Sequence, residues 1–198
     1  MNSGKILFVS QRINDMSSGA KVVSNANLAV ARAVMGQTSV DVYLIEKRRV
    51  GKLKRVLRKS RGLLDGLTSK DIDRILTKLN GNEYGIVYID SSYFGILSKT
   101  IRNRFPSIKI ITFYHDVLIH WWKETHDCNI LSYFLNYLIY RRSESLCVSV
   151  SDENIVMTNR DTQLLHDLYR LDEDKIAVIP LAIDRKTRYI HSNVSTNL

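Results

Sequence analysis

The stretch Ile108-Lys-Ile-Ile-Thr-Phe-Tyr-His115-Asp116 decides the fold class that this sequence predicts. Its first seven residues are rich in β-branched and aromatic side chains, which is typical of a strand buried on both faces, and Pro106 precedes them. A His-Asp pair follows where the strand should end. Ligands bind at the carboxyl ends of strands in open parallel α/β sheets, so His115 is a candidate site residue. The alternative is a strand-end histidine that only hydrogen-bonds a loop.

Similar apolar runs recur along the chain and alternate with helical patterns. Further strands are expected at Lys5–Ser10, Val40–Ile45, Gly85–Asp90, Glu153–Thr158 and Lys175–Ile179. This alternation predicts an α/β fold, a Rossmann-like doubly wound, mainly parallel sheet with helices on both faces. We expect one domain over residues 1–184 and a polar tail or severed linker over 185–198.

Apolar spacing and capping residues place the helices. We expect helices from the Ser18-Gly19 junction to Gly36, over Ser69–Leu79, from Ser91-Ser92 to Phe105, over Ile130–Tyr140, and from a cap at Asn159 to Leu171. The Ile130–Tyr140 helix is apolar on most sides, so we expect it deep in the core. Asp116–Asp127 is expected to be a loop, in which Trp121 and Trp122 either form a platform for a sugar or lipid or pack in the core.

Composition excludes several classes of protein. The chain is 44% hydrophobic and 25% charged, as in ordinary globular proteins, and no apolar run approaches the ~18 residues of a membrane span. No secretory signal is apparent, and two cysteines are too few for a disulfide framework, so we expect a cytoplasmic protein. The spacing of His115, His120 and His126 does not predict a metal site.

The positive charge is concentrated in one segment. Nine basic residues and no acid lie between Lys47 and Arg61, which equals the net charge of +9. With Val50, Leu53, Leu57 and Leu64 they form a basic amphipathic insert over residues 46–64, which predicts binding to an anionic membrane surface. The membrane-binding residues would be Lys52, Lys54, Arg55, Arg58 and Lys59. No aromatic residue is interspersed for base stacking, so nucleic acid is not the expected partner. A solvated helix or disordered loop is the alternative.

The Ser18-Gly19-Ala20 junction follows the first strand and begins a helix. Backbone amides at such a helix start can hold a phosphate or anionic sugar group, although neither a dinucleotide fingerprint nor a P-loop is present. A turn glycine without a ligand is the alternative.

Taken in order, these segments resemble the N-terminal, acceptor-side domain of GT-B fold glycosyltransferases, of the retaining group 1/4-like type. Lys5-Ile-Leu-Phe-Val is similar to the opening strand, Ser18-Gly19-Ala20 to the Gly-rich loop, Asp90-Ser91-Ser92 to the third strand end, Tyr114-His115-Asp116 to the strand-end His-Asp, and Ile179-Pro-Leu-Ala-Ile-Asp184 to the closing motif. Leu181-Ala182 replaces the Asn-Gly of that motif, and one loop glycine is replaced.

The resemblance implies the acceptor-binding half of an enzyme that transfers a sugar from a nucleotide-sugar to a glycan or lipid-linked acceptor in surface polysaccharide synthesis. His115 and Asp116 would be catalytic, and Ser18, Gly19, Ala20, Ser91 and Ser92 would bind substrate or phosphate. The nucleotide-sugar is a substrate, and no tightly bound cofactor or metal is implied. The C-terminal donor domain is missing, so we expect little activity from the chain alone.

The basic segment would then hold the protein at the inner membrane face. Two other hypotheses stay open for the chain at this point. It could be a non-catalytic subunit that docks a separate donor-domain partner. It could also be an unrelated Rossmann-like binder of nucleotide or nucleic acid.

Overall fold

The computed structural model describes residues 4–11, 18–46, 50–81, 83–125 and 130–180. Its centre is a six-stranded, all-parallel sheet with the strand order β2-β1-β3-β4-β5-β6. The strands are β1 (Lys5–Ser10), β2 (Val40–Leu44), β3 (Tyr84–Ile89), β4 (Lys109–Phe113), β5 (Glu153–Val156) and β6 (Ile176–Val178). The sheet confirms the Rossmann-like doubly wound fold that the alternation of strands and helices predicts.

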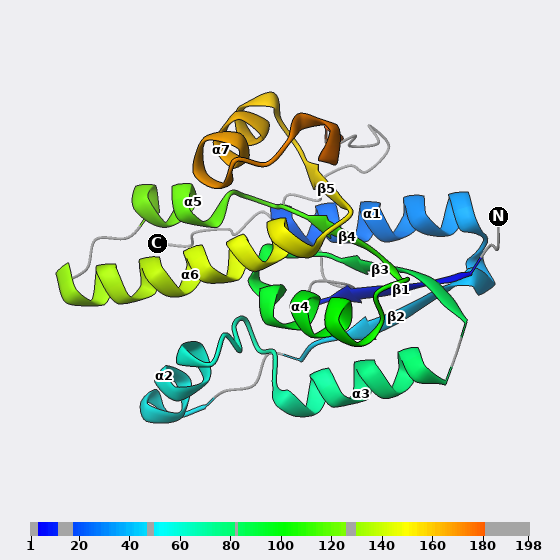
Figure 1. Cartoon of the computed structure of the whole chain (residues 1–198), viewed down its shortest axis with the longest axis horizontal. Coiled ribbons are helices and arrows are strands. Elements are labelled where there is room, and N and C mark those ends of the chain that lie inside the picture. Colours follow the sequence, from blue (N-terminus) through cyan, green and yellow to red (C-terminus); the bar gives the residue numbers. More distant parts are fainter. Residues whose placement is uncertain (1–3, 12–17, 47–49, 82, 126–129, 181–198) are drawn as a thin grey trace, which may run out of the picture.

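Helices cover both faces of the sheet (Figure 1). They are α1 (Gly19–Met35), α2 (Lys52–Ser60), α3 (Ser69–Asn80), α4 (Gly95–Arg104), α5 (Leu118–Thr125), α6 (Ile130–Val150) and α7 (Asn159–Tyr169), with short 3₁₀ turns η1 (Gln37–Ser39), η2 (Ser92–Phe94) and η3 (Glu173–Lys175). Helix α1 packs on one face against Phe8 and Phe113, whereas α3 and α4 pack on the other against Leu7 and Val87. Strands buried between two helical layers read as continuous apolar runs, which is why they could be recognised.

Local signals explain several helix ends. Gly36 ends α1 with a positive φ of 88°, and its amide donates to the Arg32 carbonyl oxygen. Thr68 and Asp71 form a reciprocal capping box at the start of α3. At α7 the predicted cap is wrong by one residue, because the Thr158 hydroxyl, and not Asn159, accepts the Asp161 amide.

The segment that contains the two tryptophans is helical, so the prediction of a loop over Asp116–Asp127 is wrong. Helix α5 spans Leu118–Thr125. Its first amide, that of Leu118, donates to the Glu144 carboxylate of α6 at 2.8 Å, which satisfies the helix end with a partner distant in sequence. The Trp122 ring is buried, with its centroid 5.1 Å from that of Tyr140.

Helix α6 is longer and less buried than its composition predicts. Its first half is only partly covered, with Ile130 87% and Phe134 55% accessible, whereas Glu144 and Cys147 in its second half are fully buried. The prediction that Ile130–Tyr140 lies deep in the core is therefore wrong. Figure 1 shows the reason, because the first half of α6 extends past the end of the sheet and only the second half runs over α4.

The contact between α4 and α6 is unusually close at Gly95. A Cβ atom on Gly95 would lie 2.0 Å from the Ser143 carbonyl oxygen, so no side chain fits there without moving the backbone. Buried beside this contact, the Cys147 thiol lies 3.6 Å from the Ser92 carbonyl oxygen and 3.7 Å from the Ser98 hydroxyl. Close packing of backbone on backbone fixes the position of α6 on the fold.

The basic segment forms a shorter helix than expected. Helix α2 covers only Lys52–Ser60, and a turn at Arg61 and Gly62 separates it from Leu64, which is buried in the core at 2% exposure. Leu64 is therefore not part of the exposed apolar face of an amphipathic helix over 46–64. Lys47, Arg48 and Arg49 lie outside the described residues, as do the closing motif at 181–184 and the polar tail.

Candidate functional site

Three strands end in polar residues at the carboxyl edge of the sheet. Ser10 is the last residue of β1, Asp90 directly follows β3, and His115 follows β4 by two residues. The chain turns in opposite directions from β1 and from β3, so the edge between these two strands is the switch point of the fold, where α/β proteins bind ligands. The sheet therefore brings His115 to the position that a ligand-binding residue would occupy.

Hydrogen bonds join these residues into one buried cluster. The Ser10 hydroxyl donates to Asp90 Oδ2 at 2.6 Å, and Asn27 of α1 reaches Oδ1 of the same carboxylate at 3.5 Å. His115 Nε2 lies 3.1 Å from the Asp90 carbonyl oxygen, 3.4 Å from Oδ1 and 3.4 Å from the Ser24 hydroxyl. Asp90 thus links the ends of β1, β3 and β4 to α1.

These contacts fix which nitrogen of the imidazole carries the proton. The Asp90 carbonyl oxygen can only accept, and the Ser24 hydroxyl donates its own hydrogen to the Ala20 carbonyl oxygen at 3.0 Å. Nε2 is therefore the protonated nitrogen of the neutral ring, and Nδ1 keeps its lone pair. Nδ1 is buried and has no hydrogen-bond partner among the described residues. It can accept a hydrogen bond from a donor that reaches it.

The imidazole is well covered. His115 is only 8% exposed, and the ring of Phe113 packs edge-on against it with 4.9 Å between centroids. A ligand group that reaches Nδ1 must therefore displace the atoms that cover this nitrogen.

The remaining residues predicted for catalysis and phosphate binding lie at three separate places: the start of α1, the loop after β4 and the start of η2. Ser18, Gly19 and Ala20 begin α1, and Ser24 links this helix start to His115. Asp116 is exposed beside His115. Ser91 instead caps η2 by accepting the Tyr93 amide.

The backbone of Ser92 contacts α6. Its carbonyl oxygen accepts the Ser143 hydroxyl at 3.0 Å, so the residue is committed to the contact with α6. Of the five predicted substrate-binding residues, those at the start of α1 are joined to His115 only through Ser24, and Ser91 directly follows Asp90 of the cluster.

Sequence reasoning missed Ser24 and Asn27, the two residues of α1 that complete the cluster. A signal was present in the sequence. Ser24 and Asn27 lie one turn apart on the same helix, between the apolar residues Val23 and Leu28. Ser24 is fully buried, and a buried hydroxyl needs a partner, which here is His115 together with the Ala20 carbonyl oxygen.

The other singled-out aromatic and histidine residues lie outside this cluster. His120 sits on α5 beside Glu124 at 3.3 Å, and Trp122 packs against Tyr133 and Tyr140. His126 lies outside the described residues. Over the residues that the structure describes, no group of three potential metal ligands occurs.

Glu144 is a second buried titratable group, away from the sheet edge. Its carboxylate accepts the Leu118 amide at 2.8 Å and the Tyr169 hydroxyl at 2.7 Å, so it joins α5, α6 and α7. Burial raises the pKa of this carboxyl from 4.5 to about 7, although these hydrogen bonds oppose the shift. Burial, and then the charge of this carboxylate, raise the pKa of the Tyr169 phenol.

The predicted membrane-binding residues divide into two groups on α2. Lys52, Lys54 and Arg55 are exposed, whereas Arg58 and Lys59 are partly buried. Exposed apolar side chains lie between them, with Leu53 85%, Val56 65% and Leu57 52% accessible. The exposed part of α2 therefore combines cations with largely exposed apolar side chains. None of the helices within these residues has the length and hydropathy of a bilayer-spanning segment.

No protein-family model matches the chain, and no curated protein is significantly similar to it in sequence. The fold and the polar cluster at its switch point are therefore what a functional assignment has to build on.

Proposed function

We propose that this chain is the acceptor-binding half of a nucleotide-sugar glycosyltransferase, in which His115 faces a glycan or lipid-linked acceptor and a donor-binding domain completes the cleft. The observation that carries the proposal is His115 Nδ1, a buried nitrogen without a partner among the described residues, at the carboxyl end of β4 beside the switch point of the sheet. A buried polar atom left unsatisfied costs about 1–3 kcal/mol, which is expected where a ligand supplies the missing hydrogen bond.

The chemistry of sugar recognition suits this nitrogen. A sugar hydroxyl can donate to Nδ1, and the Asp90 carbonyl oxygen holds the ring in the orientation that presents it. Ser24 also contacts the first turn of α1 through the Ala20 carbonyl oxygen. The backbone amides at this helix start can face an anionic group such as a departing diphosphate. No carboxylate nucleophile is assigned.

Helix α2 supports a peripheral membrane role in the same proposal. Its exposed Lys52 and Lys54 would contact anionic lipid headgroups, and Leu53 and Leu57 would enter the interface. Such binding would bring a lipid-linked acceptor to the carboxyl edge of the sheet, since α2 follows β2 at that edge (Figure 1).

The test uses the imidazole resonances of the histidines. We expect short-chain lipid-linked saccharides or free oligosaccharides to shift the His115 ring signals. His115→Gln keeps a donor that can replace Nε2 but removes Nδ1, so it should lower the affinity about tenfold, the equivalent of one lost hydrogen bond. His120→Gln, at a partly exposed position of α5 outside the cluster, is the matched control and should bind as the unmodified protein does.

A panel in which no saccharide shifts the His115 signals would overturn the proposal. So would a nucleotide or RNA that shifts them while saccharides do not, which would favour a general Rossmann-like nucleotide binder.

A further inference from the structure

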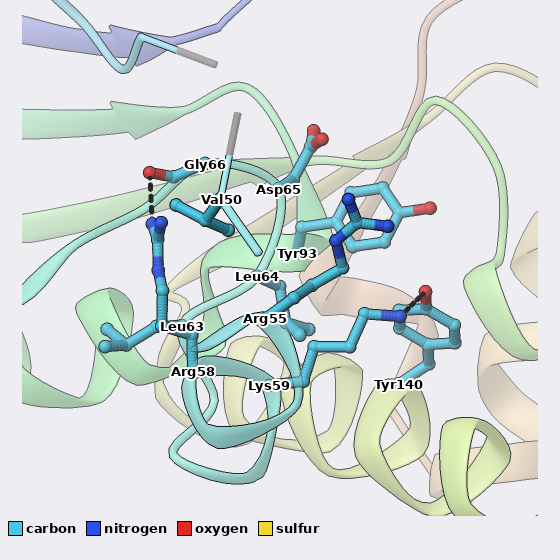
Figure 2. Close-up of a pocket in the computed structure, with 10 residues that line it drawn as sticks. All are labelled: Val50, Arg55, Arg58, Lys59, Leu63, Leu64, Asp65, Gly66, Tyr93 and Tyr140. Carbon is cyan, nitrogen blue, oxygen red and sulfur yellow. Dashed lines mark hydrogen bonds between the residues drawn. The ribbon is translucent and has the colours of Figure 1, made fainter. Parts of the chain in front are cut away.

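A cavity of about 610 Å³ lies between α2, the turn that follows it and the first half of α6 (Figure 2). This volume falls within the range of roughly 300–1,000 Å³ that is typical of small-molecule sites. The polar side chains that line it include Arg55, Lys59, Asp65, Tyr93 and Tyr140, and neither His115 nor any other residue of its cluster is among the lining residues.

The wall of the cavity is held in place by Arg58. Its guanidinium donates to the carbonyl oxygens of Gly66 at 2.8 Å and Leu67 at 2.6 Å, which ties α2 to the turn. Leu64 and Leu67 anchor the same turn in the hydrophobic core. Because its wall is fixed by charge-assisted hydrogen bonds and by buried side chains, the cavity is formed before any ligand binds.

Two cations enter this cavity with no carboxylate bound to them in the described structure. Lys59 is partly buried, and its ammonium group donates only to the neutral oxygens of Asn136 at 3.0 Å and Tyr140 at 3.4 Å. Burial, and then the nearby charge of Arg55, lower the pKa of Lys59. Both effects penalise the cation, and an anion between the two side chains would relieve both.

Two aromatic rings form the opposite side. Tyr93 of η2 and Tyr140 of α6 pack edge to face with 5.7 Å between ring centroids, and the Lys59 ammonium lies 5.5 Å from the centroid of Tyr140. Figure 2 shows Arg55 and Lys59 extending from α2 in the direction of these rings. Rings beside cations provide an apolar surface for the organic part of an anion.

Asp65 is the acid on the lining, and its placement limits how much it offsets the cations. Figure 2 shows its carboxylate turned away from the Lys59 ammonium. The Asp65 charge acts on Tyr140 instead, because together with burial it raises the pKa of that phenol. With Arg55, Arg58 and Lys59 on the same lining, the cavity keeps a positive balance.

We infer that this cavity binds an organic phosphate monoester, with the phosphate between Arg55 and Lys59 and an attached ring or chain against Tyr93 and Tyr140. Arginine and lysine together suit a dianion, because the guanidinium fork binds two oxygens and the ammonium acts as a point charge. The inference does not depend on the proposed glycosyltransferase role, because it uses none of the residues around His115.

The test measures binding of phenyl phosphate, with inorganic phosphate for comparison, by calorimetry and by protein chemical shifts. We expect phenyl phosphate to bind more tightly than inorganic phosphate. Arg55→Gln and Lys59→Gln should each weaken it at least about tenfold, as removal of a charge-assisted hydrogen bond does. Lys54→Gln is the matched control, since it removes one charge from the same helix outside the cavity lining.

Two further arms identify the source of the phosphate. For vesicles that contain phosphatidic acid, the comparison is with Lys70→Gln, which removes an exposed cation of α3 that belongs neither to the cavity nor to α2. Weaker vesicle binding by Lys59→Gln than by Lys70→Gln would identify a lipid headgroup, and equal binding of the two variants would identify a soluble phosphate. Equal losses for Lys54→Gln and Lys59→Gln with phenyl phosphate would overturn the inference, because only diffuse charge would then be acting. Thermal melting of each variant confirms that it is folded.

Discussion

Glu144 joins three helices through a single carboxylate, so its ionisation affects the fold directly. The folded side chain keeps its proton up to a pH near 7, whereas the unfolded one releases it around 4.5. Between these values the folded state binds more protons than the unfolded state does, so the stability that this group contributes falls as the pH rises. The two pKa values differ by the equivalent of about 3 kcal/mol.

We therefore expect Glu144→Gln to flatten the pH dependence of the free energy of unfolding between pH 5 and 7. The amide oxygen can still accept the Leu118 amide, and its NH₂ group can donate to the Tyr169 hydroxyl, so both contacts survive without a charge. Urea unfolding at several pH values measures the effect, with exposed Glu124→Gln as the control. An unchanged slope in the Glu144→Gln protein would refute the assignment.

Among the residues of the candidate site, those at strand ends could be predicted and those on the helix could not. His115 is readable because it directly follows an apolar run. Ser24 and Asn27 were missed because a polar residue within an apolar helix pattern looks like a solvent-facing position until the partner strand is known. The partner of Ser24 is 91 residues away in sequence.

Helix α2 has two different sides. One side carries Arg58 and Lys59, which are bound to the turn and to α6, and the other presents Leu53 and Leu57 to solvent. The helix is short, and its hold on the rest of the protein comes mainly from these charged side chains. It is therefore suited to place its outer side on another surface without losing its inner contacts.

We expect the double variant Leu53→Ser/Leu57→Ser to bind about tenfold less to phosphatidylglycerol vesicles, because two side chains no longer enter the apolar part of the interface. Cosedimentation with vesicles measures this. The control is Val30→Ser/Val34→Ser, which removes two exposed apolar side chains from α1 instead.

If both double variants lost binding equally, the membrane contact would not be specific to α2. Pure phosphatidylcholine vesicles should bind more weakly than anionic ones, because the exposed cations of α2 contribute only when lipid headgroups carry net negative charge.

Helices whose ends depend on tertiary contacts were the elements that the sequence could not define. The start of α5 is capped by Glu144 from another helix, and no residue within α5 signals it. The apolar composition of α6 indicated burial, yet burial also requires a partner, and its first half extends beyond the sheet. Elements with local caps, such as α1 and α3, were placed to within a few residues.

For the whole molecule, the order of the strands determines which parts open first. Strands β1, β3 and β4 lie between other strands and within the two main hydrophobic clusters, whereas β6 is a three-residue edge strand with Val178 38% exposed. The central strands should therefore exchange their amide hydrogens only when the whole fold opens.

Hydrogen exchange followed by mass spectrometry tests this order. We expect peptides from β1, β3 and β4 to be the slowest to exchange, and those from β6 and α2 to exchange much faster through local opening. Equal rates throughout these segments would mean that the fold opens as a single unit. Comparable protection of β6 and β3 would contradict the expected gradient.

The sheet itself was the most predictable part of the molecule. Strands buried on both faces carry their signal in a few consecutive residues, and alternation with helices dictates a parallel arrangement. The sequence did not specify the strand order or which strand ends would meet. Both depend on crossovers between segments that are far apart in the chain.

The position of the Cys147 thiol has a practical consequence. Burial raises its pKa to about 12, so at neutral pH the group is neither ionised nor reachable by an alkylating reagent. In a Cys128→Ser background it becomes the single sulfhydryl of the chain. The rate at which a maleimide labels this thiol then reports how often the contact between α6 and α4 opens. A ligand that stabilises the closed contact would slow the labelling, so the rate can be used to screen for ligands.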